Sequence, residues 1–211
     1  MPITLGPRDV LIVVDMQNDF LPGGSLAVAG GDEIVGPINR LAEKFDNVVM
    51  TQDWHPAGHI SFASSHSGKK PFETIELSYG TQVLWPDHCV IGSRGADFTS
   101  GLHIPAAQLI IRKGYHPDVD SYSGFREADR KTLTGLAGYL NERGLNRLFV
   151  CGVATDFCVG WTAVDARAAG FETYVIDDAT RGIDAAGSLA KARADMAAAG
   201  VKRITSNEVI R

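Results

Sequence analysis

Short apolar runs alternate along the chain with longer amphipathic or alanine-rich runs. Within the apolar runs, Val, Ile and Leu follow one another without polar alternation, which is typical of strands buried on both faces of a parallel sheet. Six such runs predict strands, at 9–15, 47–53, 108–113, 147–151, 172–177 and, more weakly, 202–205.

The longer runs predict four helices, at 32–45, 128–143, 155–169 and 185–199. The last three end at a glycine, the usual residue after a helix C-terminus. This alternation indicates an α/β fold: a doubly wound, mainly parallel sheet of about six strands with helices on both faces, in a three-layer, Rossmann-like arrangement. Because no linker or repeat interrupts the alternation, residues 1–211 are expected to form a single domain.

The segment 54–107 breaks this rhythm. It is rich in Gly, Pro, His, Ser and aromatic residues, and no long helix or strand is predicted in it. Irregular segments longer than about 15 residues are uncommon in compact domains and are usually functional or disordered. Its aromatic and histidine content argues against disorder, so we expect the segment to contribute to a metal or substrate site.

Composition narrows the class of protein. The chain has 211 residues, a net charge of -5, 45% hydrophobic and 21% charged residues, as in ordinary globular proteins. Mild acidity and scattered Lys and Arg residues disfavour a nucleic-acid partner. No stretch approaches the roughly 20 apolar residues that cross a membrane. The first residues lack the pattern of a secretory signal, and three irregularly spaced cysteines do not resemble a disulfide framework, so a cytoplasmic location is expected.

Polar residues follow several of the predicted strands, where ligands of doubly wound sheets bind. Asp15 ends an apolar strand, so partial desolvation should raise its pKa and suit it to proton transfer; capping the next loop is the alternative. Lys113 can pair with Asp15 or extend into water. Cys158 lies in the first turn of the helix 155–169, where the helix dipole and Lys113 would favour a thiolate; a small buried hydrophobe is the alternative.

A second group of residues is suited to a metal ion. Asp53 and His55 are separated by one residue at a strand end, so both side chains should point the same way. His59 and His88 can complete a histidine and carboxylate set, although histidines are also common on surfaces. Aromatic and apolar loop residues near the strand ends either cover the core or form a flat apolar pocket. They are Phe20, Leu26, Trp54, Trp85 and Tyr122.

Five segments, in order along the chain, resemble the nicotinamidases of the isochorismatase-like cysteine hydrolase superfamily. They read VDMQNDFLPGGSL (14–26), TQDWHP (51–56), HISF (59–62), WPDHCV (85–90) and GVATDFCV (152–159). The resemblance spans essentially the whole chain, and it implies an isochorismatase-like fold.

The resemblance implies a catalytic triad of Asp15, Lys113 and Cys158. Asp15 would accept the thiol proton and pass it to the departing ammonia, while Cys158 attacks the carboxamide to form a thioester that water hydrolyses. The backbone N–H groups of Ala154 and Cys158 would form the oxyanion hole, aimed by a cis peptide bond between Val153 and Ala154.

The resemblance also implies one divalent metal ion on Asp53, His55 and His88. His59 matches a position that binds metal in only some relatives. Zinc is the first expectation, with iron or manganese as alternatives, and the ion would hold the pyridine nitrogen of the substrate. Phe20, Trp85 and Tyr122, with Leu26 nearby, would enclose the ring.

The function implied is the metal-dependent hydrolysis of nicotinamide to nicotinate and ammonia in NAD salvage, with pyrazinamide also cleaved. Relatives that act on isochorismate, ureidoacrylate or carbamoylsarcosine are the nearest alternative, but many lack a metal, and three converging ligands weigh against them. A non-catalytic redox sensor built on Cys158 is another alternative. An exposed edge strand would permit a homo-oligomer.

Overall fold

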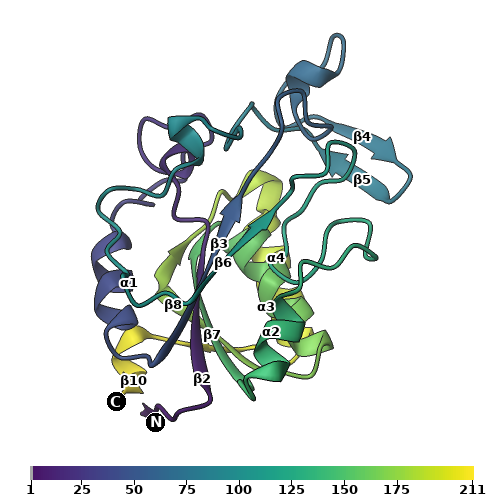
Figure 1. The fold of residues 1–211 in the computed structure, drawn as a ribbon. Helices are drawn as coiled ribbons and strands as arrows, with labels where there is room; N and C mark the ends of the chain where they lie inside the picture. Colours follow the sequence, from purple (N-terminus) through teal and green to yellow (C-terminus); the bar gives the residue numbers. More distant parts are fainter. Residues whose placement is uncertain (1) are drawn as a thin grey trace.

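The computed structural model describes residues 2–211, and its centre is a parallel sheet of six strands (Figure 1). The strands are β2 (Asp9–Val14), β3 (Asn47–Asp53), β6 (Leu109–Lys113), β7 (Arg147–Val153), β8 (Glu172–Arg181) and β9 (Lys202–Ile204). Their order in the sheet is β6-β3-β2-β7-β8-β9. The predicted doubly wound sheet is confirmed, and its strand order reverses direction between β2 and β7, which is where such folds bind ligands.

The strands separate two apolar cores because their side chains alternate between the two faces. In β2, Leu11 and Val13 face one core, whereas Val10 and Ile12 face the other. Every residue of β2 and β3 is buried. This explains why the sequence shows continuous apolar runs rather than a polar and apolar alternation.

Helices cover both faces, as predicted (Figure 1). The helix α1 (Val35–Ala42) packs Ile38 and Leu41 onto the core that contains Leu11. The opposite face is covered by α2 (Leu136–Glu142), α3 (Gly160–Ala168) and α4 (Ser188–Ala198). Three of the four helices therefore lie on one side of the sheet.

The predicted helix 128–143 is wrong over its first half. The Asp129 carboxylate accepts hydrogen bonds from the backbone of Lys131 and Thr132, and such local bonds compete with helix formation. Gly135 then adopts a left-handed φ of 95°, and α2 begins only after it. The other three predicted helices are present but shorter than expected. The predicted helix 155–169 begins with a π-helical turn (Thr155–Val159) before α3, and the predicted helix 185–199 begins with a 3-10 turn (Ala185–Gly187) before α4.

The irregular segment 54–107 contains one feature that the sequence did not predict. Strands β4 (Thr74–Leu77) and β5 (Gly80–Val83) form an antiparallel hairpin that projects from the body of the molecule (Figure 1). Its strands are short and largely exposed, so they carry no buried apolar run.

Other short elements complete the chain. Two further strands pair in parallel near the chain ends, β1 (Ile3–Thr4) and β10 (Val209–Ile210). The remaining 3-10 turns are Asn18–Phe20, Ala63–Ser65, Arg94–Ala96 and Ser206–Glu208. Within residues 2–211 no helix has the length and apolar character needed to cross a bilayer.

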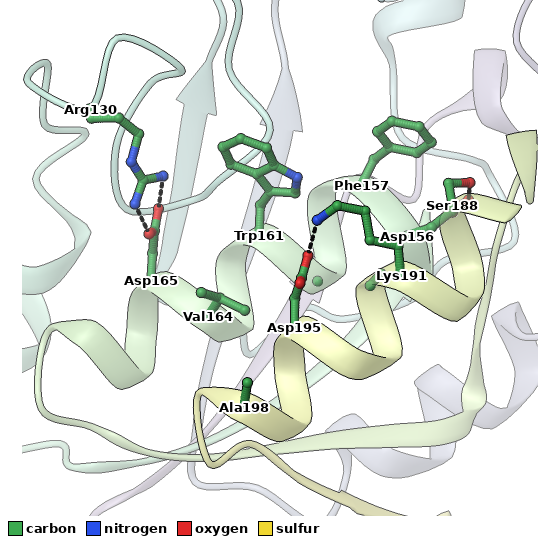
Figure 2. Close-up of a pocket in the computed structure, with 12 residues that line it drawn as sticks. Arg130, Asp156, Phe157, Trp161, Val164, Asp165, Ser188, Lys191, Asp195 and Ala198 are labelled. Atoms are coloured by element: carbon green, nitrogen blue, oxygen red, sulfur yellow. Dashed lines mark hydrogen bonds and ion pairs between the residues drawn. The ribbon is translucent and has the colours of Figure 1, made fainter. Parts of the chain in front are cut away.

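A cavity of about 560 Å³ lies on the outer side of α3 and α4 (Figure 2). Its walls include Trp161 and Val164 of α3 and Lys191 and Asp195 of α4. The candidate catalytic residues Asp15, Lys113 and Cys158 do not line this cavity. The volume of a cavity therefore does not identify the candidate active site.

Gly152 allows β2 and β7 to approach closely at the point where the strand order reverses. It pairs with Val14 and has a φ of 110°, which residues with a side chain rarely adopt. A Cβ added there would overlap the carbonyl oxygen of Val14. The next residue after Val14 is Asp15, and the turn carrying Cys158 follows β7, so this glycine brings two candidate site residues together.

We expect Gly152→Ala to lower the free energy of unfolding by about 3 kcal/mol or more, because it combines a strained φ with backbone overlap. Urea denaturation measures the change. Gly138→Ala is the matched control, since Gly138 lies in α2 with no atom within 4 Å of an added Cβ. The control should be neutral or slightly stabilising, and an equal loss in both variants would contradict the explanation.

Candidate active site

Four strands deliver the candidate residues to one edge of the sheet. Asp15 directly follows β2, Asp53 is the last residue of β3, and Lys113 is the last residue of β6. Cys158 lies in the π-helical turn after β7. Because parallel strands end at the same edge, residues far apart in the sequence meet there.

Lys113 is the centre of this group and is completely buried. Its Nζ lies 2.8 Å from Asp15 Oδ2 and forms an ion pair with Asp53 Oδ1. It also lies 3.3 Å from Cys158 Sγ and donates to the backbone carbonyl of Ser121 at 3.1 Å. Burial alone would lower the pKa of Lys113, but the two carboxylates outweigh it and raise the pKa well above its ordinary value. The amine is therefore held as an ammonium.

The two oxygens of Asp15 have different partners. Its Oδ1 accepts a 2.6 Å hydrogen bond from the Thr51 hydroxyl. Its Oδ2 is buried and forms the 2.8 Å ion pair with the Lys113 ammonium. Burial raises the pKa of Asp15 despite the opposing effect of Lys113. This carboxylate can accept a proton inside the site.

Cys158 differs from the sequence expectation in its protonation. Burial raises the pKa of its thiol well above the ordinary value, and the charges of Asp15 and Asp53 add to the effect, while Lys113 opposes it. Desolvation and two nearby carboxylates therefore oppose the thiolate that the sequence predicted, against the effect of the ammonium and the helix N-terminus. One oxygen each of Asp15 and Asp53 and the sulfur lie within 4.8 Å of one another, so a base is within reach of the thiol.

The turn before Cys158 has the backbone form that the resemblance implied. The peptide bond between Val153 and Ala154 is cis. The carbonyl oxygen of Ala154 accepts hydrogen bonds from the N–H groups of Phe157 and Val159, at 3.1 and 3.0 Å. These bonds fold the chain back so that Ala154 and Cys158 both line one pocket.

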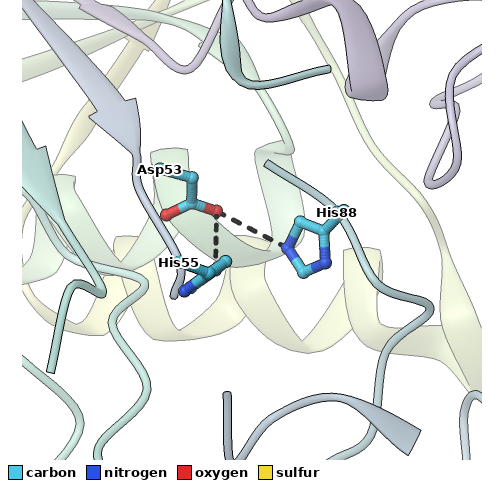
Figure 3. A group of neighbouring side chains, drawn as sticks. All are labelled: Asp53, His55 and His88. Atoms are coloured by element: carbon cyan, nitrogen blue, oxygen red, sulfur yellow. Dashed lines mark ion pairs between the residues drawn. The ribbon is translucent and has the colours of Figure 1, made fainter. Parts of the chain in front are cut away.

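Asp53, His55 and His88 form a buried cluster beside the ammonium (Figure 3). The Nε2 atoms of His55 and His88 lie 3.6 and 3.7 Å from Asp53 Oδ2. Each Nδ1 is 2.8 Å from a backbone carbonyl, that of Gly114 for His55 and that of Pro86 for His88.

These carbonyl bonds assign the ring protons of the two histidines. A carbonyl only accepts hydrogen bonds, so Nδ1 carries a proton in each ring, and Nε2 is the nitrogen that faces the carboxylate and can bind a metal ion when the ring is neutral. Two imidazole nitrogens and one carboxylate oxygen then converge on a single point. This donor set fits a divalent transition metal ion such as zinc.

Asp53 belongs to both groups. Its Oδ1 pairs with Lys113, whereas its Oδ2 faces the two histidines. Burial would raise the pKa of Asp53, but the Lys113 ammonium and His55 hold it well below its usual value. The carboxylate therefore stays ionised, as a metal ligand must be.

His59 is buried close to His55 but is held by other partners. Its Nδ1 lies 2.7 Å from the Ser61 hydroxyl, and its Nε2 lies 3.0 and 3.2 Å from the carbonyls of His116 and Val119. Burial and the neighbouring His55 lower the pKa of His59 to about 4, so the ring is neutral. Both ring nitrogens of His59 are engaged, and His59 is not part of the cluster of Asp53, His55 and His88; its ligand atom instead lies within 4.8 Å of those of His55 and Asp120.

A narrow pocket opens onto these groups. The four residues expected to bind substrate all line this pocket: Phe20, Leu26, Trp85 and Tyr122. Asp53, His88, Ala154 and Cys158 line it as well. The indole of Trp85 donates to the Tyr122 hydroxyl at 3.1 Å and meets the Phe157 ring edge to face at 4.8 Å. Aromatic and apolar side chains thus make up most of the wall, and Asp53, His88, Asp120 and Cys158 add polar groups to it.

Sequence reasoning missed three residues of the pocket wall and misplaced one. Phe157, Ile183 and Asp120 line the pocket but were not singled out. Phe157 adjoins Cys158 in the motif and was visible there, whereas nothing local marks Ile183 or Asp120. Trp54 does not line the pocket, and its ring lies under the Arg112 guanidinium at 3.9 Å.

Comparisons with known proteins show what the whole chain is similar to. The model of the isochorismatase domain matches residues 9–208. The nicotinamidase of Acinetobacter baylyi is 60% identical over 200 residues, which cover 95% of this chain and 94% of that protein. A solved nicotinamidase and pyrazinamidase structure from Acinetobacter baumannii has a TM-score of 0.95 at 59% identity, covering 96% of this chain and 98% of that one. The pyrazinamidase of Pyrococcus horikoshii, solved in complex with zinc, has a TM-score of 0.78 at 39% identity, covering 94% and 99%.

We expect Lys113→Met to lower the free energy of unfolding by about 3 to 5 kcal/mol near pH 8, because two buried carboxylates lose their ammonium. Without it, burial raises the folded-state pKa of these carboxyls above the unfolded value. The stability of the variant should therefore fall as pH rises through that raised pKa and recover toward about pH 5.

Urea denaturation of the chelated protein at several pH values tests this expectation. Lys69→Met, which changes an exposed lysine, is the matched control and should follow the wild type. A stability difference for Lys113→Met that does not depend on pH would contradict the electrostatic explanation.

Proposed function

The chain belongs to the isochorismatase family, and on that premise we propose that it is a nicotinamidase, which hydrolyses nicotinamide to nicotinate and ammonia. One observation carries this proposal. The Cys158 thiol lines an aromatic-walled pocket together with Asp53 and His88, and the Lys113 ammonium that contacts this thiol also pairs with the Asp15 carboxylate. His55 completes the candidate metal cluster with Asp53 and His88. This combination provides both a nucleophile for a carboxamide and a polar anchor for a heteroaromatic ring.

Acylation begins with the Cys158 thiol, which is protonated at rest. Asp15 accepts the thiol proton as the sulfur attacks the carboxamide carbon, so the thiolate forms only as the new bond forms. Lys113 stays charged and stabilises the negative charge on Asp15 and on the sulfur. The tetrahedral adduct then collapses, the C–N bond breaks, and Asp15 returns the proton to the departing ammonia.

Deacylation uses the same groups in reverse. Asp15, ionised again, accepts a proton from a water molecule as the water oxygen attacks the thioester carbon. The C–S bond breaks, the proton passes from Asp15 to sulfur, and the product leaves as nicotinic acid, which loses its carboxyl proton to solvent to give nicotinate. In both halves the backbone N–H groups of Ala154 and Cys158 form the oxyanion hole for the carbonyl oxygen.

The metal site consists of Asp53, His55 and His88, and zinc is the metal we propose, with iron and manganese as alternatives that the donor set also accepts. A pyrazinamidase relative is solved with zinc. When bound, the ion supplies a Lewis acid that holds the ring nitrogen of the substrate. The carbonyls of Gly114 and Pro86 orient the two imidazoles for this task.

The pocket walls select a flat ring. Phe20, Trp85 and Tyr122 enclose the substrate, and the carboxamide points toward Cys158. Pyrazinamide has the same carboxamide and a ring nitrogen in the same position relative to it. We therefore expect pyrazinamide to be cleaved as well.

We expect Cys158→Ala to release ammonia from nicotinamide at least about a thousandfold more slowly than the wild type, because it removes the nucleophile. An ammonia assay at saturating nicotinamide measures the rate. Cys151→Ala is the matched control, since Cys151 lies completely buried within β7, outside the pocket. The control should retain nearly full activity, and equal rates for Cys158→Ala and the wild type would refute the proposal.

We expect the purified protein to bind about one divalent ion per chain and His88→Ala to lose most of it, because ligand loss costs on the order of 10 to 100-fold in affinity or more. Elemental analysis after dialysis measures the metal content without an activity assay. His103→Ala, which changes an exposed histidine, is the control. Full occupancy of His88→Ala would exclude His88 as a ligand.

A further inference from the structure

A short strap, residues 182–187, links β8 to α4 and forms part of the pocket wall. The Ile183 side chain lines the pocket beside Cys158. Asp184 and Ala186 adopt left-handed φ values of 54° and 52°, which are uncommon for residues other than glycine. Such a conformation persists only where the surroundings enforce it. The strap therefore needs an anchor.

Asp156 supplies that anchor. Its side chain is 5% exposed and belongs to the π-helical turn that carries Cys158. One oxygen accepts the N–H of Ile183 at 2.9 Å, and the other accepts the N–H of Asp184 at 2.8 Å and the hydroxyl of Ser188 at 2.5 Å. All three donors are uncharged, so a full carboxylate charge is satisfied by the strap and the first residue of α4 alone. Figure 2 shows Asp156 beside Ser188 and Phe157.

The two ends of this connection meet in the substrate pocket. Phe157 and Cys158 follow Asp156 directly in the sequence, and both line the pocket together with the strap residue Ile183. The strap backbone passes close to the Asp156 carboxylate, because a Cβ added at Gly182 would lie 3.1 Å from Asp156 Oδ1. A single carboxylate thus fixes the turn that presents the sulfur and the strap that closes the pocket.

We propose that Asp156 is a positioning residue that holds Ile183 against the substrate ring while the same turn presents Cys158. Asp156 does not touch the reacting atoms. Its contribution is to bind two successive strap amides, which keeps the left-handed strap in place. The kinetic half of this inference rests on the proposed nicotinamidase function, whereas its structural half does not.

Asp156→Asn tests the inference, because asparagine keeps the shape but replaces one acceptor oxygen with an NH₂ group that faces an N–H donor. Amide hydrogen exchange at residues 183 and 184 should become about tenfold faster, as expected for the loss of a buried hydrogen bond to a charged group. The KM for nicotinamide should rise by a larger factor than kcat falls. Ile183→Ala should also raise KM, and adding it to Asp156→Asn should raise KM little further.

Asp178→Asn is the matched control. Asp178 also lies on β8, and its carboxylate accepts the N–H and hydroxyl of Ser206, but it is exposed and remote from the pocket lining. This control should change neither strap exchange nor KM. Ser188→Ala, which removes only the third donor, should speed strap exchange less than Asp156→Asn does and provides the test if Asp156→Asn fails to fold.

If Asp156→Asn folds and its amide hydrogen exchange at residues 183 and 184 equals that of the wild type, the inference is overturned. If Asp156→Asn does not fold, unchanged exchange in Ser188→Ala overturns it. Faster exchange with an unchanged KM in an active enzyme would also overturn it, because the strap would then not act on substrate. A wild-type protein without activity toward nicotinamide would refute the proposed function instead, and the exchange comparison, which needs no turnover, would still decide whether Asp156 holds the strap.

Discussion

The buried ammonium of Lys113 is the interaction on which the rest of the site depends. An isolated charge in the interior is costly, and here two carboxylates and a backbone carbonyl offset that cost. The partners come from the ends of neighbouring strands, so the ammonium requires β2, β3 and β6 to end together. The same requirement places the sulfur of Cys158 within 3.3 Å of Nζ. The parallel sheet therefore creates the charge arrangement, and the charge arrangement in turn links the strand ends.

Asp53 connects this arrangement to the metal ligands, because each of its oxygens serves a different group. The ammonium holds the carboxylate ionised, which keeps it ready for a cation on its other side. Asp15 lies on the other side of the ammonium, and burial raises its pKa whereas the pKa of Asp53 is lowered. In the mechanism we propose, Asp53 therefore binds the metal and Asp15 exchanges protons. Environment rather than residue type decides which does which.

Much of this could be predicted from the sequence, because continuous apolar runs mark β2, β3 and β7 and polar residues mark their ends. The protonation of Cys158 could not, since it depends on how deeply the sulfur is buried beside Asp15 and Asp53. The helix predicted to begin at residue 128 does not begin there, because backbone N–H groups bond to the Asp129 side chain and form a turn instead. Composition does not reveal these local hydrogen bonds. Ile183 was missed because its place in the pocket depends on a strap held by Asp156, a contact across 27 residues.

In the mechanism we propose, the Cys158 sulfur, deprotonated by Asp15, becomes acylated during turnover. Acid quenching of the enzyme during nicotinamide hydrolysis, followed by mass spectrometry of the peptide containing Cys158, measures this directly. We expect a nicotinoyl group on Cys158 in the wild type and none in Asp15→Asn. An active enzyme whose Cys158 peptide carries no acyl group, under conditions that preserve thioesters, or an acyl group on another residue, would contradict it.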